Sequence, residues 1–94
     1  MKKEILDKYK NRSEVIKALA HPARLFMLDY LFDGEKCVCK FTEELGLDQS
    51  TVSKHLAVLK NAGLVESEKR GLNVYYRLKC PCITNIFECI ENMK

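Results

Sequence analysis

Apolar residues recur every three or four positions in five stretches of the chain and alternate with polar residues in two others. The helical spacing predicts helices over residues 1–20, 22–32, 38–45 and 49–62, and a last one from about Pro81 onward. The alternating runs predict strands over residues 64–69 and 74–79. Between them, Gly71 and Asn73 can supply the positive φ that a hairpin loop requires.

Residues with strong local preferences mark the boundaries of these helices. Pro22 fits the first turn of the second helix and disfavours helical backbone at His21 before it. Asp48 is well suited as the N-cap of the fourth helix. Asn11 and Glu14 have the spacing of a capping box, which would divide the first helix into two pieces. Glycines are expected to end the second, third and fourth helices, at Gly34, Gly46 and Gly63.

The order of the elements indicates the fold. A short helix, a glycine turn and a second amphipathic helix make a helix-turn-helix, and a hairpin after it makes the motif winged. The predicted fold is mainly α, an α+β winged helix-turn-helix of about five helices with a two-stranded β-hairpin wing. Its core is expected to take one stripe from the second helix and one from the fourth: Leu25, Leu28, Leu31 and Phe32, and Val52, Leu56 and Leu59.

The chain has 94 residues, of which 47% are hydrophobic and 31% charged. This length predicts a single domain over residues 1–94, small enough to gain stability from a partner subunit. No apolar run approaches the roughly 20 residues that span a bilayer, and the polar start MKKEILDKYKNR does not resemble a secretory signal. We therefore expect a cytoplasmic protein without membrane contact.

Charge is distributed unevenly around a net value of +3. Residues 1–20 carry six Lys and Arg against three acidic residues, and residues 48–79 again carry six against three. The second basic segment coincides with the fourth helix and the hairpin. A basic excess on a helix-turn-helix and its wing favours binding to nucleic acid.

The fourth helix carries polar side chains at its N-terminal end. With its apolar stripe buried, short polar residues and one lysine project outward, where they can bond to base edges in the major groove. The hairpin tip could reach an adjacent phosphate or the minor groove. His55 fits a DNA contact and a packed position equally well. The predicted DNA-binding residues are Gln49, Ser50, Thr51, Ser53, Lys54, His55, Lys69 and Arg70.

Three stretches together resemble the ArsR/SmtB family of metal-sensing repressors: HPARLFMLDYL, LDQSTVSKHLAVLKNAGLVESEKRG and VYYRL. The resemblance extends roughly from Leu19 to Leu78. It implies a homodimeric winged helix-turn-helix repressor that binds double-stranded operator DNA of dyad symmetry and dissociates when an inducer binds. It also implies a dimer interface built from the first and last helices, and the apolar last helix agrees with this.

The segment KCVCKF resembles the thiol site of several family members. On a regular helix, residues two apart point about 200° away from each other, so Cys37 and Cys39 could share an ion only on extended or unwound backbone. The third cysteine of the family's arsenic-type site is replaced by Thr42. The His ligands that zinc sensors carry on the last helix and the N-terminal cysteines of cadmium sensors are absent. A site for As(III), Cd(II) or Zn(II) would thus need a further thiol from elsewhere in the chain or from the other subunit.

A second pair, Cys80 and Cys82, flanks Pro81 at the start of the last helix. The helix terminus there is expected to lower a thiol pKa and favour thiolate, which suits both soft-metal binding and oxidation. Cys89 is expected to pack as a small buried hydrophobe. Without an export signal, all five thiols are expected to stay reduced.

Several functions remain compatible with these residues. The cysteine pairs predict either metal or metalloid sensing or a redox-responsive repressor switched by oxidation or disulfide formation. A thiol oxidoreductase lacks support, because there is no C-x-x-C within a βαβ unit and no acid–base set. A winged helix used only for protein contacts would not need a polar recognition face. We expect a DNA-binding regulator that is not an enzyme and requires no cofactor to bind DNA.

Overall fold

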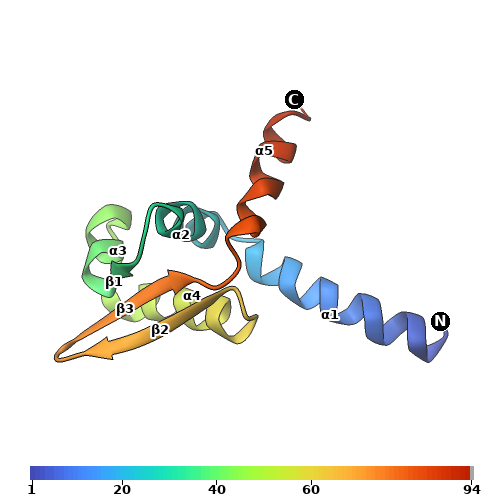
Figure 1. The fold of residues 1–94 in the computed structure, drawn as a ribbon, viewed down its shortest axis with the longest axis horizontal. Coiled ribbons are helices and arrows are strands. Elements are labelled where there is room, and N and C mark those ends of the chain that lie inside the picture. Colours follow the sequence, from blue (N-terminus) through green and yellow to red (C-terminus); the bar gives the residue numbers. More distant parts are fainter. Residues whose placement is uncertain (94) are drawn as a thin grey trace.

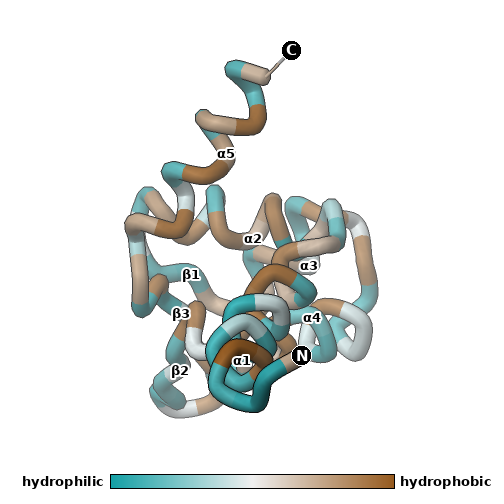
Figure 2. Tube along the Cα trace, turned by 90° about the vertical axis from the view of Figure 1, so that its right-hand side faces the viewer, coloured by the Kyte–Doolittle hydropathy of each residue, from teal (hydrophilic) through white to brown (hydrophobic). Residues whose placement is uncertain are grey.

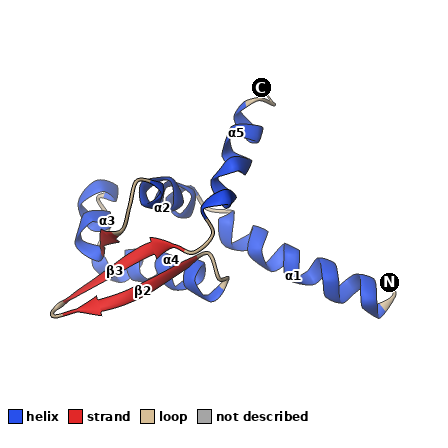
Figure 3. Ribbon diagram, viewed as in Figure 1, coloured by secondary structure: helices blue, strands red, loops and turns tan. Residues whose placement is uncertain are grey.

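The computed structural model describes residues 1–93; Lys94, the last residue of the predicted domain, lies outside this range. Two helices extend from a body made of three helices and a small sheet (Figures 1 and 3). The elements are α1 (Lys3–Leu19), α2 (Pro22–Phe32), β1 (Lys36–Cys37), α3 (Val38–Leu45), α4 (Gln49–Asn61), β2 (Val65–Arg70), β3 (Asn73–Leu78), the 3₁₀ turn η1 (Pro81–Thr84) and α5 (Asn85–Glu91). The predicted winged helix-turn-helix is confirmed.

Helix α1 is continuous, so the predicted division at Asn11 is wrong. Ser13, between the two residues of the supposed capping box, donates a hydrogen bond to the Lys10 carbonyl and lies within the helix. Only the C-terminal end of α1 enters the core, through Ala18 and Leu19. The apolar residues on its earlier turns are exposed: Ile5, Leu6, Tyr9 and Ile16.

Helix α2 begins as the sequence predicts. Pro22 occupies the first turn, and the imidazole of His21 accepts a hydrogen bond from the Ala23 backbone N–H. Leu28 and Leu31 are buried, but Phe32 is 59% exposed, so its predicted place in the core is wrong. Ala23 and Met27 are buried instead, because the face of α2 that meets the body is rotated from the one we expected.

Glycines in the left-handed region set the geometry of the helix-turn-helix. Gly46 ends α3 with a φ of 65°, and Gly63 follows α4 with a φ of 80°. A residue with a Cβ would be strained in either backbone conformation. The chain therefore turns sharply from α3 into α4, as the sequence indicated.

The sheet has three antiparallel strands in the order β1-β3-β2, one more than predicted. β2 and β3 form the wing, which turns at Gly71 with a φ of 63°. The added strand, β1, pairs Lys36 with Tyr76 and Cys37 with Tyr75. It therefore links the chain just before α3 directly to the wing.

One hydrophobic core joins the helices to the base of the wing. Its fully buried side chains include Met27, Phe41 and all three predicted residues of the α4 stripe, and Leu64 and Val65 close it from the start of the wing. No charged or polar residue is buried within residues 1–93. The core therefore fixes α4 and the wing relative to each other.

The last helix differs from the prediction at its start, where Pro81–Thr84 form a 3₁₀ turn before α5. Helix α5 rises away from the body with hydrophobic residues along it (Figure 2). Ile86 and Ile90 are exposed. Cys89 is also exposed, so its predicted burial is wrong, because no other helix of the described chain packs along α5 to cover it. No helix within residues 1–93 is long and apolar enough to cross a membrane.

Candidate nucleic-acid interface and cysteine site

The start of α4 is held by its predicted N-cap. Asp48 Oδ1 accepts a hydrogen bond from the Thr51 backbone N–H at 3.1 Å. Hydrogen bonds from Thr51 keep the pKa of the Asp48 carboxyl below its usual range, because they favour the charged form. The helix thus begins with a fixed geometry at the end that the sequence assigns to DNA.

The outer face of this first turn and a half is polar and free of core contacts. Val52, Leu56 and Leu59 are fully buried, which turns the opposite side of α4 outward. Thr51 is half-buried, and the exposed residues are Gln49, Ser50, Ser53 and Lys54. The structure brings these five predicted residues together on one end of one helix, and their contact with DNA stays a prediction.

His55 lies apart from this face and packs against the start of α2. Its ring lies 4.3 Å from that of His21, and its Nδ1 is 3.1 Å from the Nη1 of Arg24. Arg24 also donates to the carbonyl of Ala18 at the end of α1. Burial, with the nearby charges of His21 and Arg24, lowers the pKa of His55 and favours its neutral form. Of the two alternatives that the sequence left open, the structure favours the packed histidine.

The wing is less free to bind phosphate than its sequence indicates. Arg70 pairs with both oxygens of Glu35 and, at 2.9 Å, with Glu68. Arg77 pairs with Glu66 through its Nε at 2.8 Å. These ion pairs lower the pKa of Glu35 and of Glu68. Lys69 is exposed next to this cluster.

Glu35 is a functional candidate that sequence reasoning missed. It lies 35 residues before Arg70, and no local pattern joins the two. It immediately precedes β1, whose pairing with β3 brings it to the wing. A signal existed in the acidic residue two positions before Cys37, but only the third strand gives it meaning.

Cys37 and Cys39 are joined by a disulfide, so the expectation of reduced thiols is wrong for this pair. Cys37 has extended backbone, with φ −78° and ψ 156°, and is the N-cap of α3. Its Sγ accepts a hydrogen bond from the Cys39 N–H at 3.3 Å. This extended residue is the condition under which the sequence allowed both sulfurs to meet.

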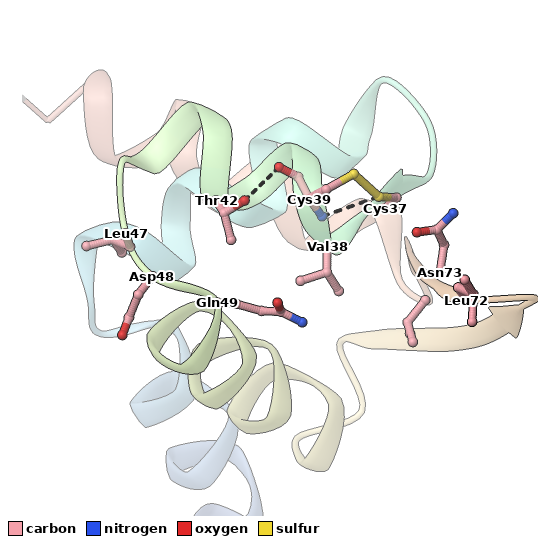
Figure 4. A pocket seen from close by; sticks show the side chains of 10 residues that line it. Cys37, Val38, Cys39, Thr42, Leu47, Asp48, Gln49, Leu72 and Asn73 are labelled. Atoms are coloured by element: carbon pink, nitrogen blue, oxygen red, sulfur yellow. Dashed lines mark hydrogen bonds between the residues drawn. A yellow bond between two sulfur atoms is a disulfide. The ribbon is translucent and has the colours of Figure 1, made fainter.

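The pair adjoins a hollow of about 520 Å³ between α3, the start of α4 and the wing tip. In Figure 4, Val38 and Gln49 extend into the space between the two helices, while Leu72 and Asn73 approach from the wing. Asp48, the N-cap of α4, also lines the hollow. A ligand at the cysteines would therefore contact both elements that the sequence assigns to DNA.

The second pair is also close together, with Cys80 Sγ and Cys82 Sγ 3.0 Å apart. The pKa of Cys82 is raised, mainly by its hydrogen bond with Cys80, so the predicted lowering at a helix terminus is wrong there. The residues after Pro81 form a short 3₁₀ turn, which offers a weaker dipole than a full helix. Within the described chain, no three Cys, His, Asp or Glu side chains are grouped to hold a metal ion.

Residues 21–67 match the model of the family described as bacterial regulatory protein, arsR family. An uncharacterised HTH-type transcriptional regulator of Methanocaldococcus jannaschii is 44% identical over 94% of this chain and 100% of its own length. The HTH-type transcriptional repressor SmtB of Mycobacterium tuberculosis is 40% identical over 81% of this chain and 54% of its own.

A solved structure has the same architecture. The homodimeric winged helix-turn-helix DNA-binding domain of a possible ArsR-family regulator from Mycobacterium bovis superposes with a TM-score of 0.83 at 30% identity. The match covers 99% of this chain and 86% of that one. Sequence and structure thus lead to the same group of proteins.

Proposed function

The chain belongs to the arsR family of bacterial regulatory proteins, and from that premise we propose that it is a homodimeric, cytoplasmic repressor released from operator DNA when its cysteines bind a soft metal or metalloid such as arsenite. The observation that carries the proposal is the hollow shared by the Cys37–Cys39 pair and the first residues of α4. A ligand held there would bias the position of the recognition helix.

DNA binding is assigned to the exposed end of α4. Its short polar side chains and Lys54 suit the major groove, and its N-terminal N–H groups suit phosphate. The wing is placed beside it by the common core. Two such helices related by a dyad would read an operator with two half-sites.

We assign dimer formation to α1 and α5 of a single domain that comprises the whole chain. Both helices leave the body and expose apolar side chains that no other part of the described chain covers. Surfaces of this kind on a small domain favour pairing with a second copy. The M. bovis relative, described as homodimeric, supports the assignment.

The test uses a duplex that this protein selects from a random-sequence pool. Lys54→Ala should weaken binding to the duplex without changing the melting temperature. The double variant Cys37→Ser and Cys39→Ser should still bind but should no longer dissociate when arsenite, Cd(II) or Zn(II) is added. Cys89→Ser is the matched control, since it removes an exposed thiol outside the hollow. Loss of DNA binding in the double variant would show that these cysteines are structural.

A redox-responsive repressor is the second candidate, favoured by the disulfide between Cys37 and Cys39. Reduction opens the pair to a dithiol, so oxidant rather than metal would change the segment before α3. The close Cys80–Cys82 pair is a further site for either chemistry. If peroxide releases the reduced protein from its duplex and metals do not, this candidate replaces the first.

A further inference from the structure

We propose that the dithiol formed by Cys37 and Cys39 binds trivalent organoarsenicals, in which arsenic carries one carbon substituent, in preference to inorganic arsenite. The substituent would occupy the adjoining hollow. The regulatory meaning of this preference rests on the proposed function, whereas the binding itself does not.

The first argument is the number of sulfur donors. Arsenite has three exchangeable oxygens, and a soft As(III) centre prefers thiolates in their place. Only Cys37 and Cys39 provide sulfur at this site, because the hydroxyl of Thr42 donates to the Cys39 carbonyl at 2.8 Å. Two thiols leave one oxygen on arsenite. They satisfy an organoarsenical completely, since its third bond is already to carbon.

The second argument is the position of the two sulfurs. They are close enough to be joined to each other, and the two Cα atoms are 5.4 Å apart. Pyramidal As(III) holds its ligands on one side, which matches neighbouring sulfurs. A linear two-coordinate ion such as Hg(II) would require the sulfurs to lie on opposite sides of the metal.

The third argument is the hollow itself. Its volume of about 520 Å³ falls within the range of small-ligand pockets, roughly 300–1,000 Å³. Its apolar lining includes Val38, Leu47, Leu72 and Val74. A bare ion at the sulfurs would leave this space to water. A carbon substituent on the arsenic would bury apolar surface there.

The binding step is balanced without redox chemistry at arsenic. The disulfide is first reduced by a phosphine, which is oxidised in turn, or by a cellular thiol. Two thiols then replace the two hydroxyls of RAs(OH)₂. Two As–S bonds form, two As–O bonds break, and two molecules of water leave with the thiol protons. Arsenic stays trivalent throughout.

The experiment compares the two dithiols of this chain after phosphine reduction. One variant keeps Cys37 and Cys39, with Cys80, Cys82 and Cys89 replaced by Ser. The matched variant keeps Cys80 and Cys82, with Cys37, Cys39 and Cys89 replaced by Ser. Calorimetry and intact mass measure the binding of hydrated phenylarsine oxide, methylarsonous acid and arsenite to each.

We expect one phenylarsenic per chain at Cys37 and Cys39. The ratio of phenyl to methyl affinity should be on the order of tenfold larger there than at the second pair, since burial of about 60 Å² of apolar surface corresponds to that factor. Leu72→Gln should lower the phenyl affinity and leave the methyl affinity unchanged. This side chain is 99% exposed, so the variant should fold normally.

Equal phenyl-to-methyl ratios at the two pairs would overturn the proposal. So would arsenite binding as tight as that of phenylarsine oxide at Cys37 and Cys39. No DNA enters this assay. A chain that failed to bind DNA would refute the proposed function and leave the arsenical result unaffected.

Discussion

Replacing Glu35 with glutamine should strengthen DNA binding by releasing part of Arg70. In the structure, three carboxylates surround two guanidinium groups at the wing, those of Glu35, Glu66 and Glu68 around Arg70 and Arg77. The cluster therefore carries one net negative charge. Phosphate cannot approach Arg70 without displacing a carboxylate. The Glu35→Gln substitution would keep the size of the side chain, remove its charge and make the cluster neutral.

The expected magnitude follows from counterion release. One additional phosphate contact steepens the dependence of log K on log salt by about 0.9. Between about 50 and 200 mM salt, the variant should therefore lose about 3.5-fold more affinity than the original protein, starting from tighter binding at low salt. The ion pairs are exposed, so the melting temperature should change little.

Fluorescence anisotropy on the selected duplex across a salt series measures both quantities. Glu43→Gln is the matched control, because Glu43 is exposed, pairs with Lys40 at 3.8 Å and changes the net charge equally. An identical salt slope for the two variants would show that only total charge matters. Weaker binding by Glu35→Gln would show that Glu35 positions Arg70 for DNA, which refutes the reasoning.

Three further predictions concern helices α3 and α4. Leu56→Ala should cost about 2–5 kcal/mol in urea unfolding, because its side chain is fully buried, whereas Lys54→Ala should stay within about 0.5 kcal/mol. Gly46→Ala should destabilise the chain by about 1 kcal/mol in the same assay, since its φ is 65°. Stability should fall as the pH drops below about 6.5, because the lowered pKa of His55 lets the unfolded chain bind more protons than the folded one. His55→Gln, which can still accept from Arg24, should flatten this dependence in urea midpoints measured at about pH 7 and 5.5.

Local signals in the sequence were enough for the helix-turn-helix. Asp48 and Gly63 mark α4 at both ends, and its apolar stripe has the helical period, so the predicted element and its buried side were confirmed. The same signals indicated the exposed polar residues at the start of α4. These features depend only on residues a few positions apart.

What the sequence could not provide depends on contacts distant along the chain. β1 has only two residues, and nothing but its pairing with β3 reveals it. Arg70 was predicted as a free cation because its partner Glu35 belongs to another element. Cys89 was predicted as buried from its apolar neighbours, but the surface that would cover it is not part of this chain's own packing.

Most of α1 lacks tertiary contacts of its own, and this has a consequence for its dynamics. The first three turns carry exposed apolar residues, and only the last turn is anchored in the core. An isolated helix shorter than about 12–15 residues is marginal in water. The backbone amides of residues 5–14 should thus exchange with deuterium quickly in dilute protein and slowly at high concentration. The exchange rate at this end of the chain would then report how much of the protein is paired.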